Sequence, residues 1–92
     1  MIHSFKDRLA EKLHKGERVR EFVNIETQAR TRLIRLDAAV SLDDLRAIRG
    51  NRLESLSGDR AGQYSIRIND QYRICFTWEE KGPCDVEITD YH

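Results

Sequence analysis

The last third of the chain alternates large apolar residues with polar ones in three separate runs. These runs are Tyr64–Ile68, Tyr72–Trp78 and Cys84–Asp90. Alternation with a period of two predicts strands that bury one face. The polar segments between them, 69–71 and 79–83, predict two hairpin turns. We therefore expect an antiparallel three-stranded unit whose apolar face the rest of the chain must cover.

Hairpin loops of three and five residues fix a single register for these strands. This register places Ile74 opposite both Ile66 and Ile88, and Phe76 opposite Val86. A slip of one residue would mix the two faces, so the pairing is well specified. The large apolar side chains then share one face: Tyr64, Ile66, Ile68, Tyr72, Ile74, Phe76, Trp78, Val86 and Ile88.

The opposite face of the predicted sheet is polar and brings two like charges together. Arg67 and Arg73 lie directly across from each other, which costs up to about 1 kcal/mol unless an anion compensates. Two interpretations remain open. Glu87, diagonal to Arg73, can complete a lattice of ion pairs on a solvated face, or the arginines can bind an anionic ligand. The same face carries Ser65, Cys75, Thr77, Thr89 and, by parity, Tyr91.

The residues before these runs predict helices and two short strands. Ser4 with Asp7, and Ser41 with Asp44, have the spacing of capping boxes that open helices. The elements expected in chain order are an edge strand Ile2–Phe5, helices Asp7–His14, Glu26–Ala39 and Leu42–Ile48, and a short strand Leu53–Leu56. This order predicts an α+β fold, with N-terminal helices packed on one face of a mostly antiparallel sheet of four to five strands.

The longest predicted helix has an apolar stripe and several arginines. Its stripe should cover the buried face of the sheet and consists of Ile25, Ala29, Leu33, Leu36 and Val40. Arg30, Arg32 and Arg35 are expected on a solvated face, with contact to a protein partner or RNA as the alternative. No linker or repeat divides the chain, so residues 1–92 are expected to form a single domain.

The charge of the chain is balanced overall but unevenly distributed. Twelve of the sixteen cationic side chains are arginine, and residues 46–73 hold six arginines and three acids. This segregation favours a local anion site over binding to a bulk polyanion. Cys75 and Cys84 are not expected to form a disulfide, because the register places Cys84 opposite Trp78. No residue spacing indicates a metal site or a cofactor, and no run is long enough to span a membrane. We expect a cytoplasmic protein.

Candidate catalytic groups gather on or beside the polar face. Arg60 lies in a loop between two glycines, which permit close approach of a ligand, and Glu54 is a possible general base. The chain ends on Asp90, Tyr91 and His92. For each group the plain alternative is a turn, a surface side chain or a frayed terminus. Together they suit cleavage of RNA without metal, which needs proton-transfer groups and cations that stabilise the phosphate. Arg67 and Arg73 can supply those cations.

Several of these segments resemble the HigB-type toxins of bacterial toxin–antitoxin pairs, within the RelE-like superfamily. The resemblance covers nearly the whole chain and is greatest to the GraT branch. It is carried by the segments Met1–Phe5, Leu53–Gly62, Tyr64–Arg67, Tyr72–Phe76 and Asp90–His92.

The resemblance implies a RelE-like fold and a ribosome-dependent endoribonuclease that cleaves mRNA and so inhibits translation and growth. It implies a HigA-like helix-turn-helix antitoxin as partner, with operator DNA bound only through the antitoxin complex and no membrane contact. Arg73, Asp90, Tyr91 and His92 match the active-site residues of the family, and Arg67 is a weaker match. The alternative is a non-catalytic RNA- or ribosome-binding module that a protein partner neutralises.

The chain departs from the pattern of this family at two positions. Other HigB toxins have a histidine where this chain has Glu54, and a lysine where it has Ser57. Either Glu54 or His92 then acts as the general base. We expect a weakened but still active toxin.

Overall fold

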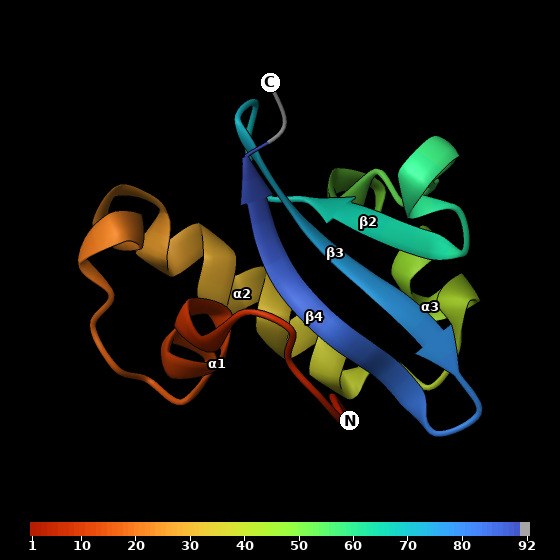
Figure 1. The fold of residues 1–92 in the computed structure, drawn as a ribbon, viewed down its shortest axis with the longest axis horizontal. Helices are drawn as coiled ribbons and strands as arrows, with labels where there is room; N and C mark the ends of the chain where they lie inside the picture. The colour runs from red at the N-terminus through yellow and green to blue at the C-terminus, as the bar shows by residue number, and fades with distance from the viewer. Residues whose placement is uncertain (91–92) are drawn as a thin grey trace.

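The three alternating runs form the main strands of the computed structural model, which describes residues 1–90 (Figure 1). They are β2 (Gln63–Arg67), β3 (Tyr72–Glu79) and β4 (Gly82–Asp90), and β1 (Glu54–Ser55) pairs with β2. The sheet is antiparallel in the order β1-β2-β3-β4. Together with the helices, it confirms the predicted α+β fold.

The register of the central hairpin is the predicted one. Ile66 pairs with Ile74, Ile74 pairs with Ile88, and Arg67 pairs with Arg73. The side chain of Asn69 holds the connecting turn, because its Oδ1 accepts hydrogen bonds from the backbone N–H groups of Gln71 and Tyr72 at 2.9 and 2.8 Å. This local bonding is typical of asparagine in turns.

The second hairpin differs from the prediction in its loop and in part of its register. Glu79 pairs with Gly82, so the loop has two residues and not five. A β-bulge then shifts the pairing: Cys75 lies opposite Glu87, but Thr77 lies opposite Cys84. The predicted opposition of Cys84 to Trp78 is therefore wrong. Alternation alone could not reveal the extra residue, which a bulge inserts on one strand only.

The bulge centres on Asp85, whose φ of 51° is unusual for a residue other than glycine. Phe76 lies opposite the bulge instead of forming a regular pair with Val86, but both side chains are buried. The predicted direct pairing of Phe76 with Val86 is therefore wrong. Cys75 and Cys84 are free thiols, as expected.

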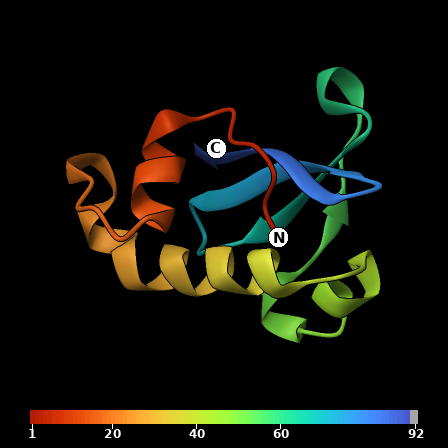
Figure 2. The ribbon, with the colours of Figure 1, turned by 90° about the horizontal axis from the view of Figure 1, so that it is seen from below.

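The helices precede the main strands. They are α1 (Arg8–His14), α2 (Glu26–Ala38) and α3 (Leu42–Arg46), with 3₁₀ turns η1 (Arg20–Ile25), η2 (Arg49–Asn51) and η3 (Gly58–Arg60). Figure 2 shows α2 running along one face of the sheet, with α1 beside it. We call the sheet face turned away from α2 the outer face.

The core lies between α1, α2 and the apolar face of the sheet. All nine apolar residues predicted for that face are buried or pack against the buried cluster. Ile25, Ala29, Leu33 and Leu36 of the predicted stripe are buried as well. Val40 is 85% exposed, because α2 ends at Ala38 and Ala39 has extended backbone that turns the next residue outward. Within residues 1–90, no helix has the length and apolarity to cross a membrane.

The helix caps follow the predicted residues only in part. The Ser41 Oγ accepts a hydrogen bond from the Asp44 backbone N–H, as a cap should. At α1, however, the cap is Asp7, which accepts from the Leu9 N–H at 2.9 Å. Ser4 instead accepts from the backbone N–H of Asp85 at 2.8 Å. Its hydroxyl therefore supports the bulge and does not open the helix.

The N-terminal segment borders β4 but forms no regular strand. The His3 N–H donates to Pro83 O at 2.9 Å, and the Val86 N–H donates to Ser4 O at 3.1 Å. A single parallel bridge joins Phe5 to Val86. The predicted edge strand Ile2–Phe5 is therefore wrong as a strand, although the segment covers part of the otherwise unpaired side of β4.

Candidate active site on the outer face of the sheet

One residue from each strand contributes to a row across the outer face. Glu54 pairs with Ser65, Ser65 with Cys75, and Cys75 with Glu87. The row therefore has a carboxylate at each end and two small side chains between them. Ser65 and Cys75 are fully buried although they lie on the polar face. Larger side chains must cover them.

Arg73 covers Ser65 and is itself only 7% exposed. Its Nε donates to Ser65 Oγ at 2.7 Å, and its Nη2 donates to the carbonyl oxygen of Arg52 at 2.7 Å. Glu54 lies beside it, with 4.0 Å between Arg73 Nη2 and Glu54 Oε1. A buried guanidinium is tolerated only when its hydrogen bonds and charge are satisfied. These contacts hold the charge of Arg73 at a defined position between β1 and β2.

The two opposed arginines avoid each other by turning in different directions. Arg73 reaches over Ser65 toward β1, whereas Arg67 forms an ion pair with Asp70 in the turn after β2. The predicted lattice, in which Glu87 forms an ion pair with Arg73, is not observed among residues 1–90. The carboxylate of Glu87 binds other cations.

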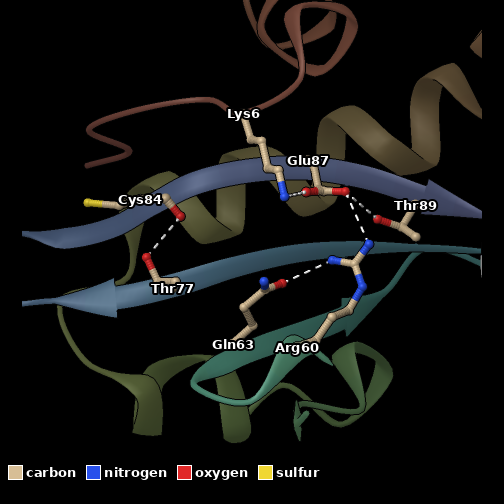
Figure 3. Close-up of polar contacts among 7 residues, drawn as sticks. All are labelled: Lys6, Arg60, Gln63, Thr77, Cys84, Glu87 and Thr89. Carbon is tan, nitrogen blue, oxygen red and sulfur yellow. Dashed lines mark hydrogen bonds and ion pairs between the residues drawn. The ribbon is translucent and has the colours of Figure 1, made fainter. Parts of the chain in front are cut away.

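Glu87 joins two cations that come from distant parts of the chain, as Figure 3 shows. Its carboxylate lies 3.4 Å from Lys6 Nζ and 3.4 Å from Arg60 Nη2. The Thr89 hydroxyl donates to the same carboxylate at 3.1 Å. Arg60 also donates to Gln63 Oε1 at 3.0 Å. The side chain of Arg60 thus reaches from η3 to the carboxylate of β4 and contacts Gln63 of β2 as well.

The structure brings some predicted site residues together and separates others. Arg73 and Glu54 adjoin each other, but Arg60 lies over the β4 side of the row and Arg67 faces the turn. Asp90 ends β4 opposite Tyr72, and its Oδ2 accepts from Gln71 Nε2 at 3.0 Å. Because side chains alternate along a strand, Asp90 belongs to the same face as Ile88 and not to the outer face. Tyr91 and His92 lie outside the described residues.

Glu54 is the exposed partner in this arrangement. Its side chain is 54% exposed, while that of Arg73 is 9% exposed. A carboxylate in contact with both water and a guanidinium is placed to exchange protons with a ligand above the sheet. Ser57, the second departure from the family pattern, precedes η3 and is exposed.

The three arginines of α2 do not form a solvated face, so that expectation is wrong. Arg30 donates to Leu13 O and Glu17 O and pairs with Glu26. Arg32 Nε donates to Arg67 O at 3.3 Å, and Arg35 Nη1 donates to Asn51 Oδ1 at 3.4 Å. Burial, followed by the charges of Arg35 and Arg67, lowers the pKa of Arg32. Helical periodicity could place these residues but not their tertiary acceptors.

Sequence reasoning missed three participants in the outer-face contacts. The alternating pattern places Ser65 on the polar face but predicts no contact for it. Arg52 acts through its backbone carbonyl, and Lys6 belongs to a segment far away in sequence. The sequence could have indicated the contact of Ser65 with Arg73, because alternation places both on the same sheet face. No sequence signal marks a carbonyl acceptor. Among residues 1–90, no group of three or more histidine, cysteine, aspartate or glutamate side chains is arranged to hold a metal ion.

The fold and the site together define a class: a small α+β protein that presents an anchored guanidinium and a neighbouring carboxylate on one face of an antiparallel sheet. Comparison with known proteins is more specific. Residues 3–92 match the family described as RelE-like toxin of type II toxin-antitoxin system HigB. Toxin HigB-1 of Vibrio cholerae serotype O1 is 39% identical over 80 residues, which cover 85% of this chain and 84% of that protein.

The chain belongs to the HigB-like, RelE-family toxins of type II toxin–antitoxin systems. A type II toxin has a protein antitoxin as its partner. The closer resemblance to the GraT branch stays a prediction.

Proposed function

We propose that this chain is a ribosome-dependent endoribonuclease that cleaves mRNA without a metal ion and thereby inhibits translation and growth. Family membership supports ribonuclease activity. The observation that carries the proposal is the buried guanidinium of Arg73, fixed by Ser65 and Arg52 O beside the exposed carboxylate of Glu54. A fixed positive charge next to an accessible proton acceptor is what phosphate-ester cleavage requires.

The proposed reaction moves two protons and exchanges one bond at phosphorus. A general base, Glu54 or His92, removes the proton of the 2′-hydroxyl, and the 2′ oxygen attacks the adjacent phosphorus. The bond to the 5′ oxygen breaks, and an acid among the C-terminal residues Asp90, Tyr91 and His92 returns a proton to that oxygen. The products are a 2′,3′-cyclic phosphate and a 5′-hydroxyl end.

Arg73 is the proposed stabiliser of the negative charge that builds on the phosphate. Guanidinium groups stay protonated in proteins, so Arg73 acts as a cation and not as the acid. Its position is set before substrate binds, because the described contacts of Nε and Nη2 are to protein acceptors. Such preorganised charges typically account for 10²- to 10³-fold in rate, or about 3–4 kcal/mol.

Arg60 and Arg67 are proposed to bind the RNA phosphates on either side of the reacting one. Arg60 pairs with Glu87 on the outer face, and Arg67 pairs with Asp70 in the turn after β2. Both are already paired with carboxylates, so a phosphate must compete with Glu87 or Asp70. The absence of the lysine of other HigB toxins at Ser57 supports a weak enzyme.

The proposed partners follow from the same assignment. A HigA-like helix-turn-helix protein is the proposed antitoxin, and operator DNA is contacted only through the toxin–antitoxin complex. The ribosome presents the mRNA, and the proposed location is the cytoplasm.

A second function, a non-catalytic RNA- or ribosome-binding module, is favoured by one observation. Arg73 donates to Ser65 and Arg52 O, which is also how a purely structural arginine would be held. Growth inhibition and ribosome binding separate the two functions. If the chain is an enzyme, we expect Arg73→Ala, or deletion of Tyr91 and His92, to abolish toxicity while ribosome binding persists. Full toxicity in both variants would falsify it.

A further inference from the structure

A second group of arginines lies around the edge of β2, away from the outer-face row. β1 pairs with β2 only at Tyr64 and Ser65, so the edge is not covered by β1 at Arg67. There the Arg32 Nε of α2 donates to the carbonyl oxygen of Arg67 at 3.3 Å. Arg32 thus satisfies an acceptor on an otherwise open strand edge.

Arg35 extends the group by one helical turn. Its Nη1 donates to the Oδ1 of Asn51, a fully buried residue whose Nδ2 donates to Leu45 O at 3.1 Å. Asn51 is therefore fixed by α3 and in turn positions Arg35. We call Arg32, Arg35 and Arg67 the edge cluster.

The edge cluster is short of negative charge. Arg67 pairs with Asp70, whose side chain is 98% exposed. Within residues 1–90, no carboxylate lies at ion-pair distance from Arg32 or Arg35, although both are half-buried. Partial burial and the charges of Arg35 and Arg67 lower the pKa of Arg32, so its protonated form is destabilised in the folded protein. An anion bound here would relieve that repulsion.

We propose that the edge cluster binds the phosphate backbone of the RNA strand, as a second anion site continuous with the one at Arg73. The identity of this ligand rests on the proposed function. Arg67 and Arg73 are direct cross-strand partners, and their Cα atoms are therefore only about 5 Å apart. A strand whose reacting phosphate lies at Arg73 can pass Arg67 and continue around the edge of β2 to Arg32 and Arg35.

RNA fits this site better than an acidic protein segment because of that continuity. Arg52 connects the two sites as well: its carbonyl accepts from Arg73, and it directly follows Asn51, the acceptor of Arg35. Guanidinium forks suit phosphate oxygens in particular. An antitoxin carboxylate is the competing ligand that the experiment must separate.

The test uses the double variant Arg32→Gln/Arg35→Gln, which keeps hydrogen-bond donors but removes two charges. The control Arg46→Gln/Arg49→Gln removes two arginine charges outside the cluster. The ligands are inorganic phosphate, followed as a rise in Tm over chloride at equal ionic strength, and a 2′-O-methyl RNA oligonucleotide that cannot be cleaved. We expect phosphate to raise Tm in the wild type and the control, and much less in the double variant.

The affinity for the oligonucleotide falls with salt, so log affinity against log salt has a negative slope. We expect this slope to become shallower by about 0.7 for each phosphate that the double variant no longer neutralises. The control should keep the wild-type slope. A double variant that retains both the phosphate effect and the slope overturns the inference. Antitoxin binding is measured on the same proteins, and a double variant that loses affinity only for the antitoxin overturns it as well. If the wild type cuts no mRNA but the phosphate effect depends on Arg32 and Arg35, the anion site stands and the proposed function fails.

Discussion

Arg73 Nε donates to Ser65 Oγ at 2.7 Å, and this bond turns the guanidinium away from Arg67, its cross-strand partner. The two arginines can then occupy opposed positions without facing each other. The carbonyl oxygen of Arg52 receives the other end of Arg73 at 2.7 Å. A serine hydroxyl and a backbone carbonyl therefore both hold the central cation in place.

Ser65→Ala tests that dependence. The substitution leaves Arg73 Nε without its hydroxyl acceptor, and we expect the free energy of unfolding to fall by about 1–2 kcal/mol. We expect mRNA cleavage to fall by about 10- to 100-fold, because the guanidinium loses its fixed position. Urea denaturation and a translation-coupled cleavage assay measure the two effects. Thr77→Ala, which removes another hydroxyl from the same sheet face, is the control, and equal losses of cleavage in both variants would refute the account.

Glu54 is tested by comparing two substitutions. Glu54→Gln removes the proton acceptor, and we expect the cleavage rate to fall by about 10²- to 10⁴-fold if Glu54 is the general base. Glu54→His restores the family residue and should be at least as active as the wild type. The assay is mRNA cleavage during translation. Full activity of Glu54→Gln assigns the base to another residue, with His92 as the next candidate.

Glu87 is predicted to hold Lys6 and Arg60 on the outer face. Glu87→Gln keeps the shape of the side chain but removes its charge, and we expect a loss of about 1 kcal/mol in the free energy of unfolding. A double-mutant cycle with Arg60→Gln measures the coupling. Glu80→Gln in the exposed β3–β4 turn is the charge-matched control. Additive effects of Glu87→Gln and Arg60→Gln would show that the pair contributes nothing.

Arg32 is predicted to lower stability through its charge. Its pKa is lowered in the folded state, so the unfolded state holds the proton more tightly, and stability rises with pH through the range between the two pKa values. At neutral pH the charged form therefore carries the full penalty. We expect Arg32→Gln to keep or raise the free energy of unfolding in chloride buffer, as measured by urea denaturation. A marked loss would mean that the hydrogen bond to Arg67 O outweighs the repulsion.

The fold was predictable where a periodic pattern decides the structure. Alternation predicted which residues of β2, β3 and β4 face the core, and the three-residue loop between β2 and β3 predicted the pairing of Arg67 with Arg73. It could not predict the bulge at Asp85, which depends on the N-terminal segment: Ser4 accepts the hydrogen bond of that residue's backbone N–H. The predicted burial of Val40 was wrong for a different reason: the predicted apolar stripe continued past Ala38, where the helix ends.

The sequence predicted Arg73 and Glu54 as members of one site, and the two adjoin, but it did not predict the contacts that hold them. The opposition of Arg67 and Arg73 indicated that their like charges need a compensating anion. The structure instead holds Arg73 with a backbone carbonyl and a serine hydroxyl. The arginines of α2 illustrate the same limit. Their acceptors, including Arg67 O and Asn51, lie far away in sequence, so a helical wheel presents them as solvent-exposed.

Cleavage of mRNA by the site around Arg73 is tested most directly by mapping mRNA 5′ ends in translating cells after induction of the wild type and of Arg73→Ala. We expect new 5′-hydroxyl ends within translated coding regions for the wild type. We expect none above background for Arg73→Ala, although that variant should still bind ribosomes. New ends at equal abundance in both strains, or none in wild-type cells that have stopped growing, would contradict cleavage by this site.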